Sequence, residues 1–249
     1  MGPRSLPLAV GVVKPRESRQ DALAVDSEDI SILLLTLRVA AISTVVILPF
    51  GVAAAWLLAR RRWRGKSLVE TLLTLPLVLP PTAVGLLLLE LLRRSGFVGR
   101  LLDRAGVEIL FTWKAVALAT AVMSFPLLVR PARAAFEGID PRLPGLARSL
   151  GRGPWHVFTR VTLPLAWRGI AAGLLLAFSR ALGEFGATIM IAGNIPGRTQ
   201  TLALAIFHRT QIGADASALR LVAVVVVVAF AAVWTTEFIE RRRARAGAR

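Results

Sequence analysis

The 249-residue sequence contains no cysteine and only two histidines. Without cysteine, the chain forms no disulfide and holds no metal through thiolate ligands. The histidines, His156 and His208, stand far apart and belong to no HExxH motif or paired-carboxylate pattern. We therefore expect no metal centre and no cofactor.

Acidic residues are also scarce, with 15 Asp and Glu against 31 Lys and Arg, a formal net charge of +16. In a soluble protein this excess would suggest a nucleic-acid partner. Here the arginines gather at the edges of apolar runs, which membrane topology explains better, so we expect no nucleic acid. Because 55% of the residues are apolar and no long polar block interrupts them, one membrane domain is expected.

Five apolar runs are candidates for membrane-spanning helices, since a helix needs about 20 residues to cross the hydrocarbon layer. They are residues 39–59, 68–92, 115–129, 170–191 and 221–239. The sequence therefore predicts an all-α membrane protein with about five transmembrane helices, formed by residues 31–240. Residues 1–30 are expected to be a flexible tail without a cleaved signal, and residues 241–249 a basic tail.

Prolines mark the second run, 68–92, which contains Pro76, Pro80 and Pro81. Prolines free backbone carbonyls that only neighbouring helices or a water-filled cavity can satisfy. We expect this run to be packed inside protein or to line a path. The third run is predicted to be short, with Pro126 near its inner end.

Basic residues between the runs predict the orientation. If the C-terminus is cytoplasmic, the inner segments hold 17 basic residues and the outer segments 12. The positive-inside rule favours this orientation, with the N-terminus outside, although four arginines oppose it. These are Arg93, Arg94, Arg100 and Arg104.

The segment 141–167, PRLPGLARSLGRGPWHVFTRVTLPLAW, is basic and kinked and lies between two apolar runs. We call it the coupling elbow. It predicts one short helix that ends before Gly151 and a second that starts at Pro154 and ends at Pro164. The second helix would present Trp155, Phe158 and Val161 on one face, with Arg152, His156 and Arg160 on the polar side.

A phosphate-binding loop is excluded at Gly65-Lys66-Ser67, because Arg60 stands where the loop requires its first glycine and no strand precedes it. The chain is therefore expected to bind no nucleotide by itself. If the chain moves a solute uphill, the energy comes from another subunit or from an ion gradient.

The elbow carries a recognisable spacing: Ala147, three residues, Gly151, nine residues, then Val161-Thr162-Leu163-Pro164. This resembles the coupling motif of the inner-membrane permeases of ABC importers. The segments LPLVLPPTAVG at 75–85, MSFPLLVR at 123–130 and RALGEFGATIMIAGNIPGRTQTL at 180–202 resemble the molybdate permeases, close kin of the sulfate permeases. The sequence departs from the motif at Gly145, where the family usually has a glutamate.

The resemblance implies a type I ABC importer permease fold in the inner membrane, with the elbow as a cytoplasmic coupling helix. It implies a homodimer, ATP-binding ABC ATPase subunits and an extracytoplasmic binding protein as partners, in a lipid bilayer. The chain itself would not be an enzyme, and molybdate, tungstate or sulfate would be its cargo. The expected ATPase-docking residues are Ala147, Leu150, Gly151, Trp155, Phe158, Val161, Leu163 and Pro164. An interfacial hinge that docks on nothing is the alternative.

Arg180 and Glu184 interrupt the fourth apolar run, and Arg180 lies about 15 Å beyond its start at 1.5 Å per residue. Arg180 could donate to a tetrahedral dianion in transit, since its planar fork suits oxyanions. Alternatively, the two form an i,i+4 ion pair that holds the bundle together, which we favour.

Two other classes of function fit the sequence less well. An intramembrane enzyme needs a nucleophile with a base, a carboxylate pair or a metal, and the apolar runs hold none of these. A stand-alone ion-coupled carrier would leave the elbow without a role and lacks visible inverted repeats.

Overall fold

The computed structural model describes residues 26–60 and 63–246, apart from the side chains of residues 97, 232–233 and 235–246. Its elements are helical throughout this part of the chain. In order they are α1 Ser27–Arg60, α2 Lys66–Val78, α3 Pro81–Leu92, α4 Phe97–Arg104, α5 Trp113–Glu137, α6 Arg142–Ser149, α7 Pro154–Val157, the π-helix η1 Phe158–Thr162, α8 Leu163–Leu182, α9 Gly186–Ala192, α10 Leu202–Gln211 and α11 Asp215–Ala246.

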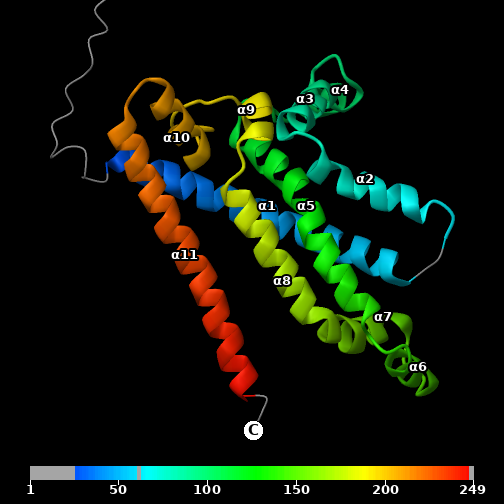
Figure 1. Ribbon diagram of the computed structural model, residues 1–249. Helices are drawn as coiled ribbons and strands as arrows, with labels where there is room; N and C mark the ends of the chain where they lie inside the picture. The colour runs from blue at the N-terminus through cyan, green and yellow to red at the C-terminus, as the bar shows by residue number, and fades with distance from the viewer. Residues whose placement is uncertain (1–25, 61–62, 247–249) are drawn as a thin grey trace, which may run out of the picture.

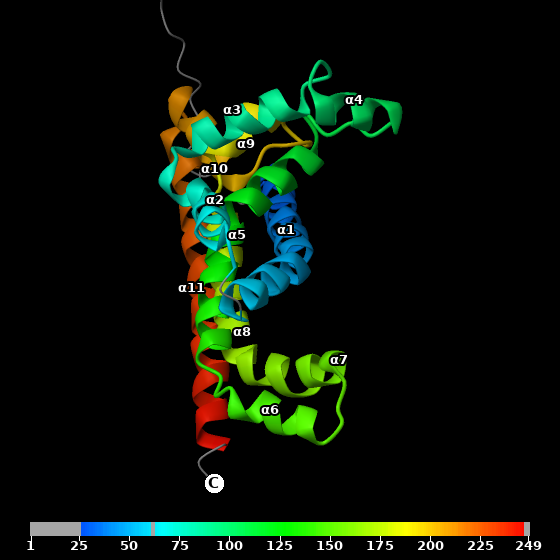
Figure 2. The same ribbon diagram turned by 90° about the vertical axis from the view of Figure 1, so that its right-hand side faces the viewer.

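Three helices are long and apolar enough to cross a membrane: α1, α5 and the continuous helix Pro154–Leu182. The bent pair of α2 and α3 can serve as one further span. The long helix α11 contains the fifth predicted apolar run, residues 221–239. In Figures 1 and 2 the C-terminal end of α11 and the elbow lie at the same end of the bundle.

Helix α5 lies at the centre, where it packs against both α1 and α8. Small residues on α8 allow the close approach to α5. A Cβ atom at Gly173 would lie 2.7 Å from the carbonyl oxygen of Leu128, and one at Gly169 would collide with Ala135. Buried apolar residues of all three helices complete this core, among them Leu58 of α1, Val129 of α5 and Ile170 of α8.

The second predicted span proved not to be one straight helix. Helices α2 and α3 are bent by 115° relative to each other at Leu79 and Pro80. A residue before proline is disfavoured in the α region, and Leu79 accordingly has ψ 145° while Pro81 starts the next helix. Helix α3 is packed within the chain, because its Val84, Gly85 and Leu92 are buried. Helix α2 has no fully buried residue in the described chain, although Val69 and Leu73 lie against the core, so the expected packing is only partly supplied within one chain.

Other boundaries also differ from those predicted. Helix α5 is longer than the third run, because it continues through Pro126 and Pro131 to Glu137. Helix α1 begins at Ser27 and thus includes residues 27–30 of the expected N-terminal tail. Helix α11 runs to Ala246, into the expected basic tail. Residues 1–25 and 247–249 lie outside the described part.

Candidate functional site

The coupling elbow consists of α6, a sharp turn, and α7 continuing into η1. The turn is made at Gly151, whose φ of +76° places it in the left-handed region that glycine adopts without steric cost. The amide of Gly151 donates to Arg148 O at 2.9 Å, and the amide of Arg152 donates to Ala147 O at 3.2 Å. These bonds satisfy carbonyls that the end of α6 leaves free.

The exposed apolar side chains of the elbow lie on both of its helices. Leu146, Leu150 and Trp155 are 62%, 79% and 75% exposed. Figure 2 shows α6 and α7 beside each other, projecting sideways from the bundle. Among the other residues expected to dock, Gly151 and Pro164 are exposed, and Ala147, Phe158, Val161 and Leu163 are partly buried. Val157, which the sequence pattern did not single out, faces inward and is buried.

The second elbow helix does not end at Pro164, contrary to the prediction. Pro164 lies in the first turn of α8, and the helix is continuous from Pro154 to Leu182. Just before the proline, the amide of Leu163 donates to Phe158 O, five residues back, which defines the π turn. Because this turn already departs from the α-helical ladder, the missing N–H of Pro164 does not break the helix.

The last turns of α1 contact the π turn through a group that we call the α1 brace: Trp56, Arg60, Phe158 and Thr162. The rings of Trp56 and Phe158 meet edge to face, with centroids 5.3 Å apart. Arg60 lies over the Trp56 ring at 5.1 Å and donates from Nη2 to Thr162 Oγ1 at 3.2 Å. Phe158 in turn lies 5.9 Å from the exposed Trp155 ring. Sequence patterns missed this group because the two segments are 102 residues apart.

Arg180 and Glu184 form the i,i+4 ion pair, with Arg180 Nη2 2.7 Å from Glu184 Oε2. The other oxygen, Oε1, accepts a hydrogen bond from the amide of Ala187 in the first turn of α9 at 2.8 Å. The predicted span 170–191 is interrupted, because α8 ends at Leu182 and α9 begins at Gly186. Arg180 therefore lies in the last turn of α8.

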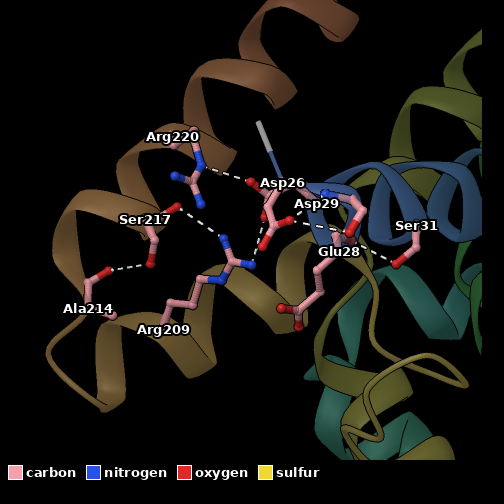
Figure 3. A network of polar contacts seen from close by, with 9 residues as sticks. Asp26, Glu28, Asp29, Ser31, Arg209, Ala214, Ser217 and Arg220 are labelled. Carbon is pink, nitrogen blue, oxygen red and sulfur yellow. Dashed lines mark hydrogen bonds and ion pairs between the residues drawn. The ribbon is translucent and has the colours of Figure 1, made fainter. Parts of the chain in front are cut away.

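A buried ion cluster at the far end from the elbow was not predicted. Asp29, only 2% exposed, receives Arg209 Nη2 at 2.7 Å on Oδ1 and Arg220 Nε at 2.8 Å on Oδ2. Arg209 also donates to Ser217 O at 3.4 Å. Figure 3 shows how these side chains join the start of α1 to α10 and α11. Sequence patterns missed this cluster because Arg209 and Arg220 lie far from Asp29 along the chain.

The segment 194–202 lies against α1 near this cluster. Thr199 Oγ1 accepts from the amide of Ile195 at 3.0 Å, which closes the turn at Pro196 and Gly197. The amide of Leu202 donates to Thr36 Oγ1 at 2.9 Å. Gln200 and its two threonine neighbours are buried, so this segment is part of the packed end of the bundle.

Comparison with known proteins identifies the family. Residues 47–245 match the family described as binding-protein-dependent transport system inner membrane component. The chain is 47% identical over 218 residues to the molybdenum transport system permease protein ModB of Escherichia coli strain K12, covering 86% of this chain and 95% of that protein. It is 40% identical over 205 residues to a putative molybdenum transport system permease protein, YvgM, of Bacillus subtilis strain 168, covering 82% and 90%.

A solved structure gives the same picture of the fold. The chain resembles a bacterial alginate ABC transporter in complex with alginate pentasaccharide-bound periplasmic protein, with a TM-score of 0.70 at 20% identity, covering 88% of this chain and 81% of that one. The predicted all-α importer permease fold is thereby confirmed. The chain belongs to the family of binding-protein-dependent inner-membrane transport components, as a multi-pass transport subunit and not an enzyme.

Proposed function

We propose that the chain is the permease subunit of an ABC importer that moves molybdate into the cytoplasm, driven by ATP hydrolysis on a separate subunit. The observation that carries this proposal is the 47% identity to a molybdenum permease across 86% of the chain. The sulfate transport permease CysT of E. coli K12 is 40% identical but covers only 65% of this chain. Sulfate and tungstate are therefore the alternative cargoes.

The elbow is proposed to seat in a groove of the ATPase subunit. Its exposed leucines and Trp155 supply apolar anchors, and a few such anchors carry most of the energy of a helix-in-groove contact. Closure of two ATPase subunits on ATP would then move the elbows as rigid levers. The α1 brace offers a second path for that movement, since it joins the π turn directly to α1.

A homodimer is proposed to form the pore. The support comes from α2, which has exposed leucines, contains Pro76 and buries none of its residues in one chain. A proline-containing helix at membrane depth needs a protein neighbour for its freed carbonyl, and a second copy supplies one. Because the chain lacks cysteine, a Leu72→Cys variant carries a single thiol, and we expect it to form a disulfide-linked dimer on oxidation. A dimer that leaves α2 facing lipid would stay uncross-linked.

The elbow and the C-terminus are proposed to face the cytoplasm, with the binding protein delivering the anion at the opposite face. The two features lie at the same end of the bundle, and they hold the basic segments that the positive-inside rule assigns to the cytoplasm. Arg180 and Glu184 are proposed as a structural pair. A guanidinium already bound to a carboxylate at 2.7 Å attracts a passing dianion weakly.

The decisive experiment measures uptake of labelled molybdate by proteoliposomes that contain this permease, its ATPase and its binding protein. Unlabelled molybdate, tungstate and sulfate are added in turn as competitors. We expect ATP-dependent uptake that unlabelled molybdate suppresses at lower concentration than sulfate. A hydrolysis-deficient ATPase is the matched control and should give none. Preferred uptake of sulfate would show that sulfate, and not molybdate, is the cargo. Uptake by the permease alone would overturn the proposal.

A further inference from the structure

The surface of the coupling elbow is positively charged and holds no internal counter-charge. Its four arginines are all exposed, and among the residues that the structure describes none of them forms an ion pair: Arg142, Arg148, Arg152 and Arg160. The carboxylate nearest to them in the sequence is Asp140, which accepts a hydrogen bond from the backbone amide of Arg142 at 2.9 Å. The elbow therefore presents cations that are free to meet another molecule.

These cations surround apolar side chains that are equally exposed. Leu150 and Trp155 stand out from the two helices of the elbow on either side of Gly151. An apolar centre with a charged rim is typical of a docking surface, and the sign of the rim selects the partner. A matching groove would combine an apolar floor with carboxylates at its edge.

Gly145 shows where the partner's charge should lie. It is exposed on α6, and Arg148 follows three residues later on the same face of the helix. The permeases that this elbow resembles usually have a glutamate here, so a basic groove would find an acidic group in them. In this chain the same groove would meet Arg148 alone and would be repelled.

We propose that the ATPase groove receiving this elbow is acidic and places carboxylates opposite Gly145 and Arg148, the reverse of a basic groove suited to a glutamate. This inference rests on the proposed function, because it requires an ATPase subunit at the elbow. It adds the chemistry of that partner's surface. It also explains how an elbow without the glutamate can dock: cations on the permease take over the electrostatic part of recognition.

Anionic lipid headgroups are the other candidate for the cations, because basic residues near a membrane attract them. The geometry favours the protein partner. Figure 2 shows the elbow helices projecting sideways from the bundle, and Leu150 at their outer turn is 79% exposed. A charged surface interrupted by apolar anchors at this turn matches a groove better than it matches a uniform layer of headgroups.

The test uses two substitutions at Gly145 that differ only in charge, Gly145→Glu and Gly145→Gln. Neither is blocked sterically, since a Cβ atom added at this position meets no other atom within 4 Å. The full-length permease is placed in phosphatidylcholine nanodiscs, and its affinity for the purified ATPase subunit is measured at low and high salt. We expect Gly145→Glu to bind about tenfold more weakly than Gly145→Gln at low salt, with the difference shrinking as salt rises.

Substitutions of arginine give a second, independent arm. Arg148→Glu should lose at least as much affinity as Gly145→Glu, and Arg148→Lys should keep most of it. Arg168→Glu is the matched control, because this exposed residue lies on α8 outside the elbow, and it should bind as the wild type does. Equal losses for Arg148→Glu and Arg168→Glu would overturn the inference.

The remaining outcomes are equally decisive. Tighter binding of Gly145→Glu than of Gly145→Gln would mean that the groove is basic, and the inference would be wrong. A charge effect that appears only when phosphatidylglycerol is added would assign the cations to lipid and also overturn it. If the wild type binds no ATPase, the proposed function fails and takes the inference with it.

Discussion

The arginines near the start of α1 are paired within the chain, whereas those of the coupling elbow are not. At the end where α1 begins, Arg209 and Arg220 both contact the buried carboxylate of Asp29, within 2.8 Å. On the coupling elbow itself, exposed arginines surround exposed leucines and a tryptophan, and none of these arginines joins an ion pair with the described residues. The ion pairs of Arg133 with Glu70 and Glu137 lie outside the elbow, on α5 and α2. The first end is satisfied from within the chain, and the second needs a partner. This difference indicates which end is a fixed support and which is a contact surface.

Removal of the buried carboxylate should have the largest effect on stability. An Asp29→Asn variant leaves two largely buried guanidinium groups facing a neutral amide, and breaking such a cluster costs about 3–5 kcal/mol. We expect a clear drop in thermal unfolding temperature of the purified protein in detergent. Glu28→Gln is the control, because Glu28 is exposed one residue away, and it should unfold as the wild type does. Equal stability of the two variants would remove the supporting role of this end.

The pair at the end of α8 should come next. Glu184→Gln loses the charge that holds Arg180, while its amide oxygen can still accept from Ala187, so about 2 kcal/mol should be lost. If the pair is structural, the Glu184→Gln variant should give a reduced yield of assembled complex in size-exclusion chromatography. The uptake per assembled complex should stay unchanged. Normal assembly with altered uptake would instead assign Arg180 to the path of the anion.

The turn of the elbow provides a more localised test. Gly151→Val forces a β-branched residue to a φ of +76°, and a side chain there costs about 1–2 kcal/mol or more. We expect the protein to insert in the membrane normally but to lose co-purification with the ATPase and to lose uptake. Gly153→Val is the comparison, because Gly153 has a φ of −64° and open space around it. Unchanged transport in Gly151→Val would count against docking.

The α1 brace should give the smallest loss of stability but a distinctive loss of function. Trp56→Leu removes the edge-to-face contact with Phe158 and the face beneath Arg60, together about 1–2 kcal/mol. Because Leu150 and Trp155 remain, ATPase binding and hydrolysis should persist while molybdate transported per ATP falls. Trp167→Leu, at an exposed position on α8, should leave that ratio unchanged. A parallel fall of hydrolysis and transport would make the brace merely structural.

Local patterns predicted the helices because apolar runs and their flanking charges are themselves local. The turn of the elbow was equally predictable, since Gly151 and Pro154 both act on their own backbone, whereas the predicted helix end at Pro164 was wrong. The ion pair of Arg180 with Glu184 needed only helical spacing. What sequence alone left open at the elbow is the partner's surface, on which the proposed docking depends.

Contacts between distant segments could not be predicted in this way. Asp29 and Arg220 are 191 residues apart, and each looks like an ordinary charge at a helix end. Proline was also ambiguous, because Pro80 and Pro81 accompany a bend of 115° while Pro126 and Pro131 lie inside a continuous helix. The difference depends on whether neighbouring helices hold the chain straight, as α1 and α8 do for α5.

The π turn at Phe158–Thr162 fixes the number of residues between α7 and α8. Deleting one residue there would restore an α-helical turn and rotate everything before it by about 100° around the helix axis. Val157 would then leave the core and Trp155 would swing from its present direction. Homologous chains should therefore tolerate changes of side chain in this turn far more readily than a change in its number of residues.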